Sequence, residues 1–355
     1  MRENAENKCC LVLEGGGVKC SYQYGVLKTL VAYYGSVQEA VETLCSRAPE
    51  NAGLLPEGSG CVGQTAADAL VSSESNAIKN PPVFNGVAGS SFGALNSAML
   101  LADGMDKLES FWENISAESI FHEPRLQTVM DKIYHRQKVF DLQTVVFALS
   151  SGLDPLAKQR EISQLYYDFI LKNVDEDAVR DCGLELGITA VELADFEIDE
   201  DAMNKLSLGP DKLKTLPVDV KPEDIRLLPN YSKFVSKRLR EMYLEDIPSG
   251  LLPSFVAASA AFPAFKPMRV GDTYYTDGGV LDNIPIKMME RRGFTSALCI
   301  RTGRGEPKKR WSDDMRVTFI TPSRELGAAA IFSVDNVRET IALGEYDAKK
   351  FLIGG

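Results

Sequence analysis

Twice near its start, the chain passes from a short apolar segment through a glycine-containing turn into a segment with helical periodicity. Residues 9–14 read CCLVLE and end at three consecutive glycines, and residues 83–90 read VFNGVAGS and lead into SFGALNSAML. Short apolar runs of this kind are typical of strands buried on both faces of a parallel sheet. The repeated order of strand, turn and helix predicts an α/β fold with a mostly parallel sheet between helical layers.

The remaining sequence continues this alternation. Further strands are expected within residues 184–198, 273–286, 295–302 and 316–321, and helices within residues 18–34, 36–50, 107–180, 232–243 and 251–262. Residues 36–82 are rich in Gly, Ser, Ala and Asn after the expected helix at their start. We expect them to be a largely irregular insertion.

Composition limits the classes of partner. The chain has 355 residues, of which 45% are hydrophobic, and a formal net charge of −11. Its length allows a large core. An acidic chain is unsuited to nucleic acid as a main partner, because counterion release needs a cationic surface. An acidic chain also has no long-range attraction to anionic lipid, so any contact with a lipid surface is expected to be local and apolar.

Cysteine usage and the amino-terminal residues bear on the compartment. The seven cysteines are an odd number without metal-ligand spacing, which predicts free thiols, a reducing compartment and no metal site. The sequence starts with the polar stretch MRENAENK, and no stretch approaches the roughly 18 apolar residues of a membrane-spanning helix. We therefore expect a cytoplasmic protein.

The turn GSSFG places Ser91 at the centre of a G-x-S-x-G pattern, flanked by Gly89 and Gly93. Between a strand and a helix, this is the pattern of a nucleophile elbow, in which a tight turn projects the serine hydroxyl. The alternative is a tight connection in a buried core, since glycine and serine are common turn residues.

A catalytic serine needs a base, and the usual base is histidine. The chain has only His122 and His135, and neither follows an acid in the order of the α/β-hydrolases. Asp277 is the other candidate base. It precedes Gly278 and Gly279, where the backbone can turn sharply, although Asp-Gly is also a common turn dipeptide.

A third motif consists of Gly15, Gly16 and Gly17, followed closely by Lys19. Such a loop exposes backbone N–H groups at a helix N-terminus and favours negative charge. The phosphate-loop pattern is absent, and Cys20 occupies the last position of the dinucleotide pattern. The loop is either an anion cradle, such as an oxyanion hole, or a structural turn.

In this order, the motifs resemble those of the patatin-like phospholipase family. The matching blocks are GGGVKC, GSSFG, ASAAFPAFKP and YYTDGGVLDNIPI, and the resemblance covers about residues 9–302. The chain departs from the family pattern at Cys20, where glycine is usual, and in a longer gap between the first two blocks, which contains residues 36–82.

The resemblance implies a three-layer α/β/α fold and hydrolysis of lipid acyl esters by a Ser–Asp dyad. Ser91 would be the nucleophile and Asp277 its base, with no metal or organic cofactor. The implied oxyanion hole consists of the backbone N–H groups of Gly15, Gly16, Gly17 and Phe92. Lys19, at the family's basic position, would either attract a phosphate head group or satisfy nearby carbonyls and acids.

Three further features each allow two interpretations. Residues 249–265 would line an acyl channel or form a core helix beside the elbow. Asp282 and Asn283 suit the capping of a following helix as well as chemistry. A basic cluster suits either lipid head groups or a solvated helix face, and it consists of Lys233, Lys237, Arg238 and Arg240.

We expect a single domain over residues 1–355, with a core over about residues 9–302, the insertion over about residues 36–82, and a strand and helices in residues 303–355. The expected function is that of a phospholipase A or lysophospholipase with peripheral membrane contact, regulated by a partner or ligand that the residues do not identify. The same dyad would also hydrolyse other acyl esters or thioesters. A catalytically silent relative would instead bind a ligand or a protein.

Overall fold

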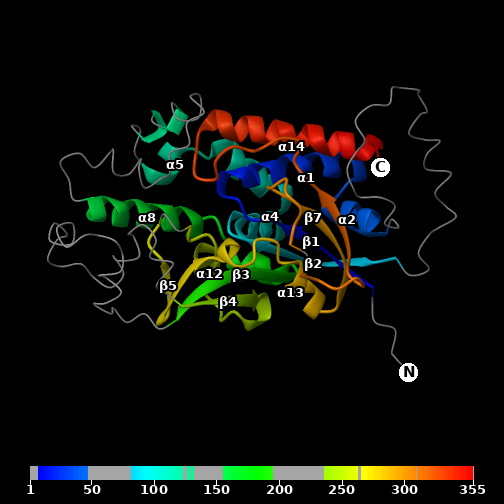
Figure 1. Cartoon of the computed structure of the whole chain (residues 1–355), viewed down its shortest axis with the longest axis horizontal. Helices are drawn as coiled ribbons and strands as arrows, with labels where there is room; N and C mark the ends of the chain where they lie inside the picture. The colour runs from blue at the N-terminus through cyan, green and yellow to red at the C-terminus, as the bar shows by residue number, and fades with distance from the viewer. Residues whose placement is uncertain are drawn as a thin grey trace.

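The chain forms a sheet of eight strands with helices on both faces, as the computed structural model shows for the described residues (Figure 1). The structure describes residues 7–46, 81–122, 126–128, 130–131, 155–194, 236–262, 265–308 and 310–354. This arrangement of a central sheet between helices is the α/β fold that the sequence predicted.

The elements have the following bounds. The strands are β1 (Lys8–Leu13), β2 (Val83–Ser90), β3 (Glu185–Ala194), β4 (Ser236–Tyr243), β5 (Met268–Val270), β6 (Thr273–Asp277), β7 (Phe294–Ile300) and β8 (Arg316–Ile320). The helices are α1 (Ser21–Tyr34), α2 (Val37–Ser46), α4 (Phe92–Asn114), α5 (Ala117–Phe121), α8 (Pro155–Leu171), α9 (Glu176–Asp181), α12 (Leu252–Ser259), α13 (Ile286–Arg291) and α14 (Val334–Gly354), with short 3-10 turns η1 (Gly17–Cys20), η5 (Leu244–Asp246) and η6 (Gly278–Val280).

The middle of the sheet is parallel, as predicted. β1 pairs in parallel with β2 on one side and with β7 on the other, β2 pairs with β3, and β7 pairs with β8. Side chains of β1 alternate between two cores: Cys9, Leu11 and Leu13 enter the larger core, and Cys10 and Val12 the smaller one. Both faces of β1 are therefore buried, which explains its uninterrupted apolar sequence.

The two cores are covered by different helices. The larger core lies between the sheet and a layer that includes α1, α2, α4 and α12. The smaller core is closed by α13 on the opposite face of the sheet (Figure 1). Met288 and Met289 of α13 pack there with buried residues of β1 and β7. None of the described helices combines the length and the apolar character that crossing a bilayer requires.

β3 joins the parallel part of the sheet to an antiparallel part. Residues 187–194 of β3 pair with β4 along one edge. Two strands pair with the other edge of β3, one after the other along its length. The parallel strand β2 pairs with residues 185–189, and the antiparallel strand β6 pairs with residues 190–193. The carboxyl ends of β2 and β6 therefore meet on this edge, with Ser90 opposite Thr189 and Asp277 opposite Ala190.

β4 corrects one prediction, since residues 236–243 form a strand and not part of a helix. Along β4, Arg238 and Arg240 are exposed whereas Leu239 between them is half-buried. Lys, Arg, Leu, Glu and Met favour helices, and this composition misled the prediction. Pairing with β3 along its whole length overrides that local preference.

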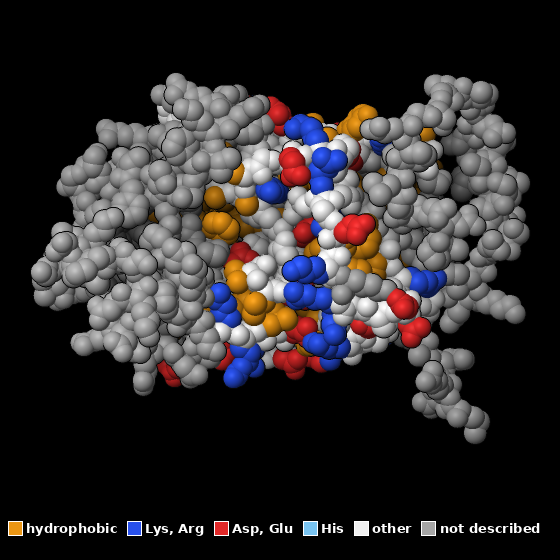
Figure 2. Space-filling model, in the orientation of Figure 1, with side chains coloured by type: hydrophobic (Ala, Val, Ile, Leu, Met, Phe, Trp, Pro, Cys, Tyr) orange, Lys and Arg blue, Asp and Glu red, His pale blue; other side chains and the backbone are white. Residues whose placement is uncertain are grey.

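The basic cluster on this strand is balanced by acids. Arg238 and Arg240 both form ion pairs with Glu192 of β3. Figure 2 shows Lys or Arg and Asp or Glu side chains interspersed on the described surface in this part of the molecule. Lys233, the first member of the predicted cluster, lies outside the described residues. The described members of the cluster therefore do not form an uncompensated cationic patch.

The expected insertion begins with a helix. Residues 37–46 form α2, as predicted, and its Val41 and Leu44 are buried in the larger core. The following residues 47–80, which make up most of the expected irregular insertion, lie outside the described residues. After residue 302, the chain forms β8 and α14.

α14 packs on α1 with the two backbones in contact. A Cβ atom on Gly25 would lie 2.2 Å from the carbonyl oxygen of Ile341, and one on Gly344 would lie 2.3 Å from that of Tyr22. No side chain fits at either position unless the helices separate. The last helix therefore fixes α1, and with it the turn η1 that precedes α1.

We expect Gly344→Ala to lower the free energy of unfolding by about 1–3 kcal/mol, because the added methyl group overpacks the contact between the helices. Urea unfolding followed by tryptophan fluorescence measures this. Gly354→Ala is the matched control on the same helix, since a Cβ there meets nothing within 4 Å. Equal unfolding midpoints for the two variants would contradict the close packing of α1 and α14.

Candidate active site

Ser91 is the junction between β2 and α4. Its φ of 54° and ψ of −130° lie in a region that residues other than glycine rarely adopt. Because β2 ends at Ser90 and α4 begins at Phe92, a single residue turns the chain from strand to helix. This is the backbone geometry of a nucleophile elbow.

The glycines on either side of Ser91 allow the elbow to pack. A Cβ on Gly89 would lie 2.3 Å from the carbonyl carbon of Gly93, and a Cβ on Gly93 would lie 2.2 Å from the carbonyl oxygen of Leu13. Neither position can hold a larger residue without moving the helix from the sheet. The spacing G-x-S-x-G thus follows from the close approach of β1, β2 and α4.

Ser91 and Asp277 lie in direct contact. The Ser91 hydroxyl donates a hydrogen bond of 2.6 Å to Asp277 Oδ2. Both residues are largely buried, with 6% and 5% of their surface exposed, respectively. β3 brings them together, since it aligns the end of β2 with the end of β6.

The turn after Asp277 supplies a second hydrogen bond. The backbone N–H of Gly279 donates to Asp277 Oδ1 at 2.7 Å. Gly278 lies against β3, where its Cβ would be 2.2 Å from the carbonyl oxygen of Thr189. The two glycines therefore let the chain turn tightly enough for the carboxylate to accept from Gly279 while facing Ser91.

Burial changes the acidity of Asp277. The loss of hydration raises the pKa of Asp277 from 3.8 to about 6, and the hydrogen bonds from Ser91 and Gly279 only partly oppose this effect. The carboxylate is therefore ionised at neutral pH but binds a proton more tightly than an exposed aspartate does.

Ser259 supports the elbow and was missed as a site residue. The backbone N–H of Ser91 donates to Ser259 Oγ at 2.8 Å, and Ser259 Oγ donates to the carbonyl of Thr189 at 2.6 Å. The side chain thus ties the elbow to β3. Ser259 lies in the block ASAAFPAFKP, which the sequence analysis used for the resemblance but not for a residue role.

The glycine loop lies against the nucleophile. A Cβ on Gly15 would be 3.0 Å from the Cβ of Ser91. The N–H of Gly15 is occupied, because it donates to the carbonyl of Asn283 at 3.2 Å. Within the described part of the chain, the N–H groups of Gly16 and Gly17 have no hydrogen-bond acceptor. These two donors are therefore available to a ligand.

A buried polar network below the loop also escaped the sequence analysis. Glu14 directly precedes the glycines, and its carboxylate forms an ion pair with Arg301 at 3.2 Å. The same carboxylate accepts from the backbone N–H of Thr302 at 2.7 Å. From the other side, Gln23 Nε2 donates to the carbonyl of Glu14 at 2.6 Å. In the sequence, one glutamate before three glycines gives no indication that Arg301, Thr302 and Gln23 bind it.

Phe92 and Lys19, the other two predicted site residues, lie in different elements. Phe92 is the first residue of α4, so its backbone N–H is one of the donors that a helix leaves unpaired at its start. Its ring is fully buried in an aromatic cluster with Trp112 and Tyr166. Lys19, in η1, is half-buried, and no ion pair to it occurs among the described residues.

No described histidine is placed to act as the base. His122 ends α5 with a φ of 51°, and His135 lies outside the described residues. The hydrogen-bond acceptor of the Ser91 hydroxyl is Asp277. Over the same described ranges, no group of His, Cys, Asp and Glu side chains is arranged to hold a metal ion.

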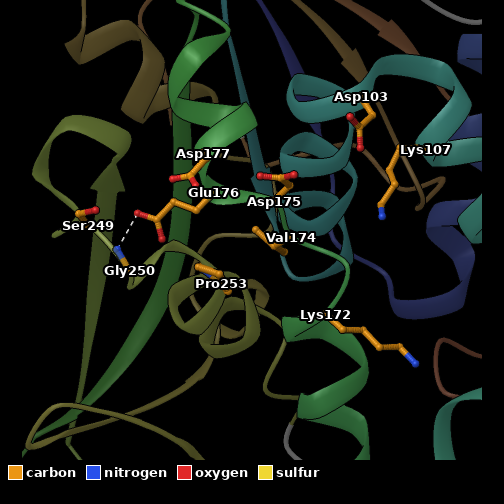
Figure 3. A pocket seen from close by; sticks show the side chains of 10 residues that line it. All are labelled: Asp103, Lys107, Lys172, Val174, Asp175, Glu176, Asp177, Ser249, Gly250 and Pro253. Carbon is orange, nitrogen blue, oxygen red and sulfur yellow. Dashed lines mark hydrogen bonds between the residues drawn. The ribbon is translucent and has the colours of Figure 1, made fainter.

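A surface cavity of about 550 Å³ has a different set of lining residues (Figure 3). It is lined by residues from α4, from the connection between α8 and α9, from the start of α9, and from the segment that leads into α12. Its polar lining includes Asp103, Lys107, Lys172, Asp175, Glu176 and Asp177. Glu176 accepts from the backbone N–H groups of Gly250 and Leu252 and so holds the start of α12. Neither Ser91 nor Asp277 lines this cavity, and we assign it no part in the chemistry.

A comparison with protein families identifies the family to which this α/β fold and its serine–aspartate contact belong. A family model described as patatin-like phospholipase matches residues 77–289, which is more than half of the chain and includes Ser91 and Asp277. The chain therefore belongs to the patatin-like phospholipase family. No curated protein matches it.

Among solved structures, the chain is similar to the crystal structure of VipD from Legionella pneumophila. The two share 14% sequence identity with a TM-score of 0.36, and the match covers 98% of this chain and 67% of that chain.

The raised pKa of Asp277 makes a prediction about stability. Below the unfolded value of 3.8 the carboxyl is protonated in both states, so burial carries no ionic penalty. As the pH rises to about 6, the unfolded state ionises first, and the folded state loses up to about 3 kcal/mol relative to low pH.

Asp277→Asn does not titrate, so its stability relative to the wild type should rise between about pH 4 and about pH 7, by at most about 3 kcal/mol. Urea unfolding of both proteins at both pH values measures the free energy of unfolding in each case. The contributions of the other titrating groups are the same in the two proteins and cancel when the variant is compared with the wild type. A stability difference that is the same at both pH values would contradict a raised pKa at Asp277.

Proposed function

We propose that this chain is a serine lipid acyl hydrolase of the phospholipase A or lysophospholipase type, with Ser91 as nucleophile and Asp277 as base. The observation that carries the proposal is the 2.6 Å hydrogen bond between them. It gives a proton acceptor to the hydroxyl of a serine held at a strained strand-to-helix turn. Membership of the patatin-like phospholipase family supports lipid acyl hydrolysis in general.

In the first half of the reaction, Ser91 Oγ attacks the acyl carbonyl carbon while Asp277 Oδ2 accepts the hydroxyl proton. The ester C–O bond then breaks, and the proton passes from Asp277 to the leaving alkoxide. The products of this half are an acyl-serine and an alcohol. A pKa of about 6 makes Asp277 a stronger base than an ordinary aspartate, and the group is still ionised at neutral pH.

In the second half, Asp277 removes a proton from a water molecule that attacks the acyl-serine. The C–O bond to Ser91 Oγ breaks, Ser91 takes the proton back from Asp277, and a fatty acid leaves. The same carboxylate thus serves as acceptor and donor in both halves, and no further titrating group is needed.

The negative charge on the attacked carbonyl oxygen needs donors. We assign this role to the N–H groups of Gly16, Gly17 and Phe92, which have no partner within the described residues. The N–H of Gly15 is used by Asn283, so Gly15 is assigned to the support of the loop. A single donor of this kind typically contributes about a hundred- to a thousandfold in rate.

The surroundings of the dyad suit an acyl lipid. The N–H of Asp277 donates to the carbonyl of Ala261, and the next residue, Phe262, is 39% exposed. Val280, in the turn that follows Asp277, is also 39% exposed. Exposed apolar side chains in the segments next to Asp277 favour contact with an acyl chain or a lipid surface. Lys19 is the candidate contact for a phosphate head group.

Incubation with a diacyl phospholipid, a lysophospholipid and an acyl thioester, followed by measurement of released fatty acid, tests the proposal. We expect release from the phospholipid or lysophospholipid, and a loss of at least about a thousandfold in Ser91→Ala, because the nucleophile is removed. A fluorophosphonate should label Ser91. Undiminished labelling of Ser91→Ala would refute the assignment, and release from the thioester alone would favour the other acyl substrates.

The pH dependence separates Asp277 from the histidines. We expect kcat/KM to fall below about pH 6, because protonated Asp277 cannot accept the serine proton. An unperturbed histidine titrates near the same pH, at about 6.5. The double variant His122→Gln/His135→Gln should therefore retain both the activity and the acid limb. If this variant folds normally but loses either one, the Ser–Asp dyad is wrong.

A further inference from the structure

Every polar atom of Gly15 is engaged. Its N–H donates to the backbone carbonyl of Asn283 at 3.2 Å. Its carbonyl accepts from Asn283 Nδ2 at 3.0 Å and from Thr302 Oγ1 at 2.7 Å. Asn283 follows the turn after Asp277, and Thr302 follows β7. Two distant loops therefore hold this one residue of the glycine loop.

These hydrogen bonds fix the direction of a neighbouring donor. The carbonyl of Gly15 and the N–H of Gly16 belong to the same planar peptide unit, and in the trans form they point in opposite directions. No cis peptide bond occurs among the described residues. Two hydrogen bonds on the Gly15 carbonyl consequently set where the Gly16 N–H points, and that N–H is one of the proposed oxyanion donors.

Asn283 also sets the spacing between the glycine loop and the aspartate turn. A Cβ on Gly15 and a Cβ on Gly279 would each lie 2.4 Å from Asn283 Oδ1. The amide is thus wedged between two positions that only glycine can occupy. Because Gly279 donates to Asp277 Oδ1 at 2.7 Å, Asn283 contacts the donor loop on one side and the turn of the base on the other.

The buried carboxylate of Glu14 binds both Asn283 and Thr302. Its Oε2 accepts from the backbone N–H of Thr302 at 2.7 Å, and its Oε1 accepts from Asn283 Nδ2 at 3.3 Å. Arg301 compensates the charge at 3.2 Å, and both side chains of this ion pair are less than a tenth exposed. Asn283 and Thr302 are therefore fixed before any substrate arrives.

We propose that Asn283 and Thr302 form a clamp on the Gly15 carbonyl that aims the Gly16 N–H at the oxyanion, so that both are positioning residues for acyl transfer. The inference rests on the proposed function and adds two residues to it. Neither side chain is assigned a contact with the reacting atoms. The clamp acts on charge that develops in the transition state, so its loss lowers kcat and leaves KM nearly unchanged.

Thr302→Val is the sharpest variant, because it removes the hydroxyl donor at nearly constant volume. With p-nitrophenyl butyrate as substrate, kcat falls about ten- to a hundredfold and KM stays within about twofold. Asn283→Ala gives a loss of the same order. The double variant loses less than the product of the two single effects, since both side chains act through the same carbonyl.

A transition-state analogue gives a readout that a merely structural role would not move. A trifluoromethyl ketone with the same acyl chain adds to the serine as a hemiketal oxyanion. Its affinity falls in proportion to kcat/KM across the variants, whereas the affinity for an unreactive ether analogue, which has no carbonyl, stays constant.

Matched controls lose similar hydrogen bonds elsewhere. Thr318→Val removes a hydroxyl of β8 that donates to the carbonyl of Leu44. Asn173→Ala removes an amide that donates to the carbonyl of Phe169 in α8. Both keep the wild-type kcat and the wild-type affinity for the ketone. A fall in ketone affinity in these controls as large as in Thr302→Val would overturn the clamp.

The outcomes separate the two levels of inference. If the wild type hydrolyses the ester but Thr302→Val keeps its full kcat, or loses kcat at unchanged ketone affinity, the clamp is wrong and the proposed function stands. If the wild type neither hydrolyses any ester nor binds the ketone, the proposed function fails, and the clamp fails with it. Should Asn283→Ala not fold, Thr302→Val alone decides.

Discussion

A serine hydroxyl and a carboxylate from distant parts of a chain form a short hydrogen bond only if the backbone aligns both segments. In this protein the alignment comes from a single edge of β3, on which β2 and β6 lie end to end. The two strands run in opposite directions, so the residue after β2 and the last residue of β6 face each other. Ser259 also ties the elbow to β3, since its hydroxyl forms hydrogen bonds with the backbones of both Ser91 and Thr189. The site is thus a consequence of how the sheet changes from parallel to antiparallel.

Space is the second constraint on the site. Gly89 and Gly93 let α4 approach β1 and β2, and Gly278 lets the aspartate turn lie on β3. This close packing removes water from Asp277 and so raises the pKa of its carboxyl. Dense packing and altered acidity therefore have one origin. The same packing explains why strain at Ser91 persists, since the elbow has no room to relax.

Much of this could be predicted from sequence where the signal is local. Glycine spacing around Ser91 and after Asp277, and buried runs such as residues 9–14, depend on neighbours along the chain, and they led to the correct fold class. β4 was mistaken for a helix because its residues favour helices and only the distant strand β3 selects the extended form. The contacts of Glu14, Ser259 and Asn283 were not predictable, because each joins residues that lie far apart in the sequence and share no pattern.

The glycine loop near the amino terminus depends on residues that come much later in the chain. Gly15 is bound by Asn283 and Thr302, and the N–H of Val18 donates to the carbonyl of Ala329. A ribosome makes these residues in order, so a nascent chain already contains Ser91 and the glycine loop while Asn283, Thr302 and Ala329 are still to be made. The proposed site is therefore complete only after residue 329 has been synthesised, and any shorter nascent chain lacks part of the support for its glycine loop.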